Sequence, residues 1–142
     1  MSLFRIFDIA GSALNAESVR MNTTASNMAN ANSAASSSGA TYRAREPVFQ
    51  PALDAAIDAF DSEGAASAGV KVAGIVESQT PLRREFQPAS PLADREGYVF
   101  LPNVNTVEEM ANMISASRSY QTNIEVMQAS KRMLQQTLSL GQ

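Results

Sequence analysis

The chain has 142 residues, a formal net charge of −3, and neither cysteine nor histidine. This composition excludes disulfides and thiol chemistry, and it removes the commonest general base and the commonest metal ligand. The acidic balance gives no electrostatic footprint for nucleic acid, and no apolar run reaches the length of a membrane span. We therefore predict no catalytic residues, no metal, no cofactor, no nucleic-acid partner and no direct membrane insertion.

Charge is spread unevenly along the chain. Residues 1–42 carry four charged side chains, residues 43–103 carry fifteen, and residues 104–142 carry six. A helix bathed in water on most of its surface usually carries about a quarter to a third charged residues. The charge-poor terminal segments are therefore predicted to bury more than one face.

The N-terminal segment has apolar side chains at alternating steps of four and three residues, from Leu3 to about Met28. This period predicts a helix with a weak seam, and Gly11 weakens it further. The apolar start is similar to a signal peptide, but Arg5 and Asp8 interrupt it, so we expect the segment to be retained. The seam residues predicted here are Phe7, Leu14, Met21 and Met28.

No charged residue lies between positions 22 and 42. Within this tract the asparagines at positions 22, 27, 30 and 32 have two interpretations: their amides bond neighbouring backbones, or they cap a frayed helix end. The run Ser33 to Thr41 is rich in small polar residues and is typical of a flexible linker.

The middle region holds the strand signals, in the run 70–76 and in Tyr98 to Leu101 after a turn-like Asp-Arg-Glu-Gly. Five of the six prolines also lie here, which predicts a small, loop-rich β module. Residues 52–60 allow only a short helix. The acidic group at positions 54, 58, 61 and 63 is better explained as a solvated edge than as a metal or acid-base site.

The closing segment, from Pro102 to Gln142, is predicted to be one helix, because no glycine or proline occurs between Val104 and Leu140. Asn105 is placed to cap it. By spacing alone the seam fits an intramolecular hairpin or an assembly equally well, and the low charge favours burial by several copies. Its seam residues are Met110, Met113, Tyr120, Ile124, Met127, Leu134 and Leu138.

Two segments resemble a known family. Ala25-Ser-Asn-Met-Ala-Asn-Ala-Asn-Ser33 resembles the N-terminal signature of flagellar rod, hook and hook-filament junction proteins. Gly97-Tyr-Val-Phe-Leu-Pro-Asn-Val-Asn105, with Val107-Glu-Glu-Met110 and Ser117-Arg-Ser-Tyr-Gln121, is similar to the proximal-rod members of that axial family.

This resemblance implies a non-enzymatic rod subunit that transmits torque. It also implies export by the flagellar type III apparatus without a cleaved signal, and a periplasmic site in the basal body. The implied partners are other rod proteins and copies of itself, the inner-membrane ring with its adaptor, and the export apparatus. Polar contacts between subunits are expected at Asn22, Asn27, Asn30, Asn32, Asn103, Asn105, Arg118 and Gln121.

Together these inferences predict a mainly α fold, in which long terminal helices pack as a coiled-coil-like pair around the export channel. The expected parts are an N-terminal helix of the inner domain (1–32), a linker (33–42), a small β-rich outer module (43–103) and a C-terminal inner helix (104–142). The alternative function is a soluble coiled-coil adaptor or export chaperone that binds a single client.

Overall fold

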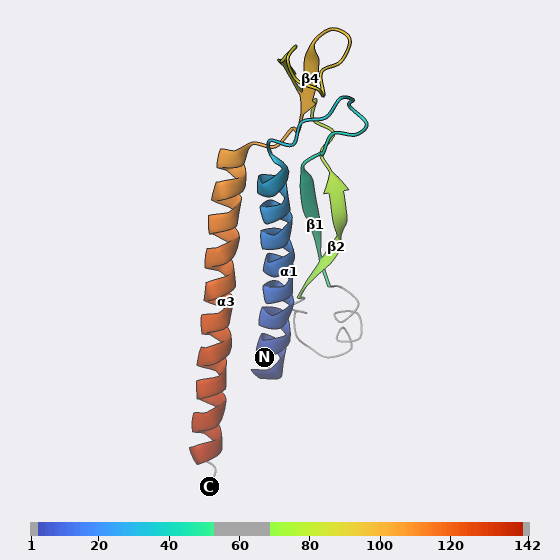
Figure 1. The fold of residues 1–142 in the computed structure, drawn as a ribbon. Helices are drawn as coiled ribbons and strands as arrows, with labels where there is room; N and C mark the ends of the chain where they lie inside the picture. The colour runs from blue at the N-terminus through green and yellow to red at the C-terminus, as the bar shows by residue number, and fades with distance from the viewer. Residues whose placement is uncertain (1–2, 53–68, 141–142) are drawn as a thin grey trace. The chain divides into compact units, whose positions relative to one another are not determined.

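A computed structural model describes residues 3–52 and 69–140. In chain order its elements are helix α1 (Leu3–Asn30), strands β1 (Arg45–Pro51), β2 (Val70–Glu77), β3 (Arg83–Phe86) and β4 (Tyr98–Leu101), and helix α3 (Thr106–Leu140) (Figure 1). The predicted terminal helices and the β segments between them are confirmed. The short helix and the acidic group suggested for positions 52–63 lie almost wholly outside the described residues.

The chain divides into two compact units, and α1, β1, β2 and α3 each contribute to both. The first unit contains the described parts of Met1–Val19, Val48–Gly74 and Ser115–Gln142. The second unit contains Arg20–Pro47 and Ile75–Ile114. Each unit is described by itself below.

Helix α3 begins where the sequence predicts. The side chain of Asn105 accepts a hydrogen bond from the Val107 N–H at 3.2 Å, and its carbonyl accepts the Glu109 N–H at 2.9 Å. Asn105 is therefore the N-cap, and it satisfies amide groups that have no partner inside the helix. Acidic residues follow in the first turn, where they complement the helix dipole.

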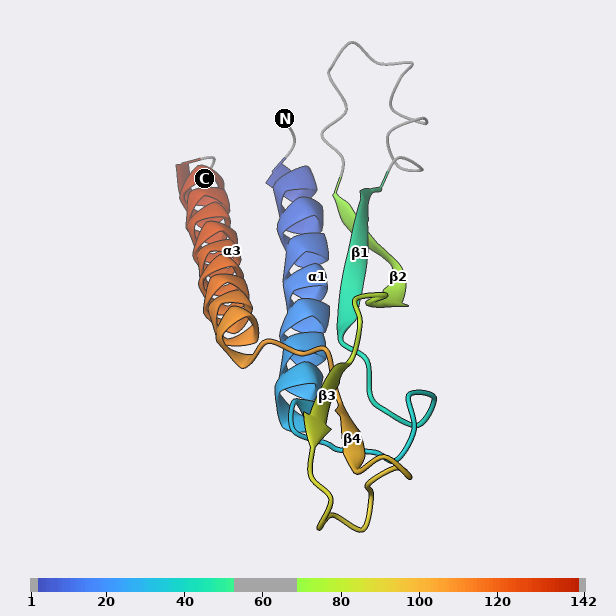
Figure 2. The same cartoon turned by 90° about the horizontal axis from the view of Figure 1, so that it is seen from above.

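Two small antiparallel sheets lie between the helices, β1 with β2 and β3 with β4. In the second unit, β3 and β4 form a hairpin in the register Arg83↔Leu101 to Phe86↔Tyr98 (Figure 2). The hairpin turn is held by Asp94, whose carboxylate accepts the amides of Glu96 and Tyr98 at 2.9 Å each. Gly97 completes the turn with a φ of 84°, which favours glycine.

Aromatic and cationic side chains cover the hairpin. The Phe86 and Tyr98 rings meet edge to face at 5.2 Å, and the Arg84 guanidinium lies 4.6 Å from the centre of the Tyr98 ring. Arg84 also contacts Asp94 at 3.5 Å and Glu96 at 3.4 Å. These contacts explain why a strand with the sequence Arg-Arg-Glu-Phe forms although its composition is a poor strand signal.

A third chain segment joins this hairpin. The amide and carbonyl of Ala35 exchange hydrogen bonds with Phe100 at 2.9 and 3.0 Å. Val99 is fully buried, and Ala31, Ala44 and Val104 form a small apolar cluster with Tyr42 packed against it. The apolar core of the second unit is thus small, and much of its buried contact is polar.

Candidate functional site

Asn27 is the centre of a buried polar junction in the second unit. Its side-chain amide nitrogen donates to the Arg45 carbonyl at 2.8 Å and to the Glu109 carboxylate at 2.9 Å. Its oxygen accepts the Tyr42 hydroxyl at 2.8 Å and the Arg45 N–H at 2.9 Å. The side chain is 1 % exposed and makes all four hydrogen bonds of which an amide is capable. It therefore ties α1, the start of β1 and the start of α3 together.

A second asparagine holds the neighbouring residue. The Asn103 oxygen accepts the Ala44 N–H at 2.8 Å, while its amide nitrogen donates to the carbonyls of Thr80 at 2.8 Å and Ser78 at 3.3 Å. The adjacent backbone amides of Ala44 and Arg45 are thus bound by one asparagine each. We call these contacts, with those of Asn27, the asparagine clamp.

Glu109 is the charged member of the clamp. Its burial raises the pKa of the carboxyl above the usual range, and the hydrogen bonds from Asn27 and Thr24 partly offset this rise. The neighbouring charges of Glu108 and Glu46 raise the pKa further. An ionised carboxylate here is tolerated because hydrogen bonds replace part of its lost hydration.

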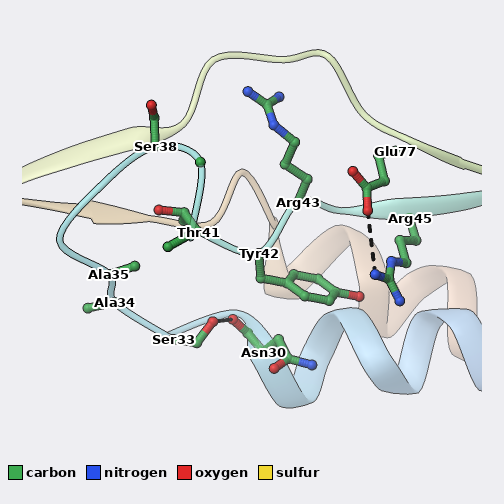
Figure 3. Close-up of a pocket in the computed structure, with 12 residues that line it drawn as sticks. Asn30, Ser33, Ala34, Ala35, Ser38, Thr41, Tyr42, Arg43, Arg45 and Glu77 are labelled. Atoms are coloured by element: carbon green, nitrogen blue, oxygen red, sulfur yellow. Dashed lines mark hydrogen bonds and ion pairs between the residues drawn. The ribbon is translucent and has the colours of Figure 1, made fainter.

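A pocket of about 600 Å³ opens beside the clamp, between the segment after α1 and the facing ends of β1 and β2 (Figure 3). Its walls are mostly small or hydroxylic side chains, and Arg45 and Glu77 form an ion pair at 3.4 Å on one side. Among the described residues, no group of three or more acidic side chains is placed to hold a metal ion.

The residues of the predicted assembly seam are partly exposed. Met110 and Leu138 are 53 % and 65 % exposed, and the remaining nine are half-buried. The most buried helical positions are instead small or polar. They are Ala10, Ala16, Thr23, Thr24 and Asn27 on α1, and Glu109, Ala116 and Ser130 on α3. Sequence reasoning missed them because it weighted large apolar side chains; the three- and four-residue spacing of the small ones was the available signal.

The predicted inter-subunit polar residues fall into two groups. Four use their amides within the chain: Asn27 and Asn103 in the clamp, Asn105 as the cap of α3, and Asn30 by donating to the Ser26 carbonyl at 2.8 Å. The other four are exposed, namely Asn22, Asn32, Arg118 and Gln121. Contact between subunits stays a prediction for all eight residues.

The closing residues of each helix also match known families. Residues 7–34 match the model of the flagella basal body rod protein family, and residues 95–140 match the C-terminal model of the flagellar basal body rod FlgEFG proteins. Over its full length the chain is 54% identical to the flagellar basal-body rod protein FlgC of Salmonella typhimurium, and all of that protein is covered. The chain belongs to the FlgC family of flagellar basal-body rod proteins.

Other members of the family match along their full length as well. The FlgC protein of Escherichia coli O6:H1 is 53% identical over 142 residues, and that of Buchnera aphidicola from Schizaphis graminum is 42% identical over 144 residues. A chain of this family is a structural component of the rod and not an enzyme. The two model matches cover most of α1 and all of β4 and α3, so family membership is carried by the elements that the asparagine clamp joins.

Proposed function

We propose that the chain is a proximal-rod subunit that polymerises through its terminal helices around the export channel and transmits torque along the drive shaft. The observation that carries this proposal is the full-length match to rod proteins at 51% to 54% identity, with no unmatched domain on either side. A rod subunit must present surfaces to copies of itself and to other rod proteins, and its helices supply them.

We place the inner domain in residues 1–32 and 104–142, the connecting segment in 33–42 and the outer module in 43–103. The concentration of charge in the middle region supports this division. Within the second unit, α1 and α3 are joined by the Asn27–Glu109 hydrogen bond and by Arg20 donating to Asn112 at 3.4 Å. Those contacts support a paired inner domain with a coiled-coil-like seam.

Basal-body location follows from the family, and its finer details are part of the proposal. We place the subunit in the periplasm, after export through the flagellar type III apparatus with its N-terminus retained. Its partners are other rod proteins, copies of itself, the inner-membrane ring and the ring's adaptor. No described helix is both long and apolar enough to cross a membrane.

Complementation tests the proposal in a motile bacterium from which the gene for its own FlgC-family protein has been deleted. We expect the chain to restore swimming and to appear in purified basal bodies. N-terminal sequencing of the recovered chain should start at Met1 or Ser2. The adaptor or chaperone alternative predicts a small defined oligomer outside the basal body, and finding the chain only in that form would overturn the proposal.

A further inference from the structure

Helix α3 carries two separate exposed apolar surfaces. The first, here called the front patch, consists of Val107, Met110 and Ile114, which are 74 %, 53 % and 54 % exposed. They are spaced at i, i+3 and i+7 and so lie on one side of the helix. Glu109, on the opposite side, is buried in the asparagine clamp. The front patch is thus turned away from the contacts that hold the second unit together.

The second surface, here called the rear patch, consists of Val126 and Met133, which are 41 % and 49 % exposed. These residues are also seven positions apart, so each patch spans two helical turns, or about 10 Å. Large apolar side chains in a group are the usual sign of a protein–protein contact, whereas single ones are unremarkable.

The charges beside the two patches are opposite. Between positions 106 and 117 the charged residues are Glu108, which is exposed, and the buried Glu109. Between positions 126 and 140 they are Lys131 and Arg132, both exposed. An acidic apolar surface and a basic apolar surface of equal length are complementary in charge and in extent.

The two patches cannot meet within one chain, because both lie on a single uninterrupted helix. We propose that the front patch of one copy binds the rear patch of the next copy. Such a contact joins different surfaces of two identical chains, so it repeats without closing and generates a helical filament or ring. This inference rests on the proposed rod function and names the surfaces by which copies meet.

Each contact is small, so a single one holds two free subunits weakly. Repetition along an assembly, together with the other contacts of each subunit, makes it effective. The arrangement also keeps a subunit monomeric before it reaches the growing rod.

Cysteine cross-linking tests the contact cleanly, because the chain has no cysteine of its own. The double variant Ile114→Cys with Met133→Cys is produced in the deletion strain, and purified basal bodies are oxidised and run on a non-reducing gel. We expect a ladder of dimers and higher oligomers that disappears on reduction. Each single variant should remain monomeric, since neither patch faces its own copy.

The matched control combines Ile114→Cys with Gln135→Cys. Position 135 is exposed and lies about 160° around the helix from Met133, so this pair should give no ladder. A dimer formed by Ile114→Cys alone would show symmetric self-pairing and overturn the proposal. So would the absence of a ladder in cells that swim and carry the variant in their basal bodies. Absence of the unmodified chain from basal bodies would instead refute the rod function itself.

Charge exchange provides the second readout. In the double-cysteine background, Glu108→Lys should lower the ladder yield roughly two- to fivefold, the range of a surface ion pair. Adding Lys131→Glu and Arg132→Glu should restore it. An unchanged yield in the Glu108→Lys chain would contradict the charge complementarity on which the pairing rests.

Discussion

At the scale of single residues, Asn27 holds together three segments of the second unit that are far apart in sequence. Its amide reaches the backbone of Arg45, the hydroxyl of Tyr42 and the carboxylate of Glu109. A fully bonded amide stabilises and also specifies, since any other arrangement of these segments would leave buried polar groups without partners.

Replacing Asn27 by alanine should therefore destabilise the chain strongly. The change leaves a backbone amide, a hydroxyl and a buried carboxylate without their hydrogen bonds, which costs about 2–4 kcal/mol. Urea unfolding followed by far-ultraviolet circular dichroism measures the loss. Asn22→Ala, at an exposed position of the same helix, is the matched control and should change stability by less than about 0.5 kcal/mol. Equal effects of the two substitutions would refute the role assigned to Asn27.

Glu109 gives the clamp a pH dependence. Because its pKa is raised in the folded chain, the folded state holds the proton more tightly than the unfolded state does. Its contribution to stability is thus fully present below the unfolded pKa and is lost as pH rises through the higher folded pKa. Asp94 has a lowered pKa, mainly through the hydrogen bond from the Tyr98 amide, and acts in the opposite direction, losing its contribution as pH falls.

Glu109→Gln isolates this effect, since glutamine keeps an oxygen for the Asn27 amide and cannot ionise. We expect the variant to be at least as stable as the unmodified chain at pH 7, with the difference shrinking as pH falls below the unfolded pKa. Urea midpoints measured across this range test it, and the contribution of Asp94 cancels between the two proteins. Glu108→Gln, which is exposed, serves as control. A variant that is less stable by a constant amount at every pH would contradict the interpretation.

At the scale of elements, the sequence predicts the helices well and the strands partly. The apolar period and the Asn105 cap predict α1 and α3, and the β-branched run 70–76 predicts β2. Strands β1 and β3 were missed because β1 contains Pro47 and Pro51 and β3 is Arg-Arg-Glu-Phe. Such strands depend on their pairing partners and on the asparagine clamp, which come from distant parts of the chain.

The same reasoning applies to the candidate site. The cluster of asparagines signalled that amides bond neighbouring backbones, and Asn27 does so. Its partners Tyr42, Arg45 and Glu109 are up to 82 positions away, and no local pattern identifies them.

Gly97 is the residue on which the β3–β4 hairpin turns. A Cβ there would lie 2.8 Å from Cε2 of Phe86 and 3.3 Å from Cβ of Pro88, on a backbone with a φ of 84°. Gly97→Ala should therefore weaken the hairpin by about 1–2 kcal/mol. Faster hydrogen exchange of the Gln87 amide, which is bonded to the Gly97 carbonyl at 2.9 Å, reports the change.

The control for this substitution is Gly74→Ala in β2. A Cβ at position 74 meets nothing within 4 Å, and the φ of Gly74 is not positive. Exchange at Gln87 should be unaffected in this variant. Unchanged exchange in Gly97→Ala as well would show that the turn does not depend on the left-handed glycine.

At the scale of the whole molecule, the distribution of exposed apolar side chains indicates a chain built for assembly. Eleven described residues of the helices were predicted to form a seam, yet none of them is fully buried in the single chain. Large apolar side chains that stay half-exposed leave hydrophobic free energy to be gained on association, at about 25 cal/mol per Å² covered. In the proposed rod, neighbouring subunits cover them.

Ile124→Asp tests this arrangement directly, because it places a charge in the seam without touching the asparagine clamp or the β3–β4 hairpin. An ionised side chain buried between subunits without a partner costs several kcal/mol, so rod assembly should fail. Swimming should be lost, while protease-accessible chain still appears in the periplasm because export precedes assembly. Ile124→Val keeps the apolar surface and should swim. If Ile124→Asp cells swim normally and carry the chain in their basal bodies, Ile124 does not belong to the seam, and the seam must instead follow the small buried face marked by Ala116 and Ser130.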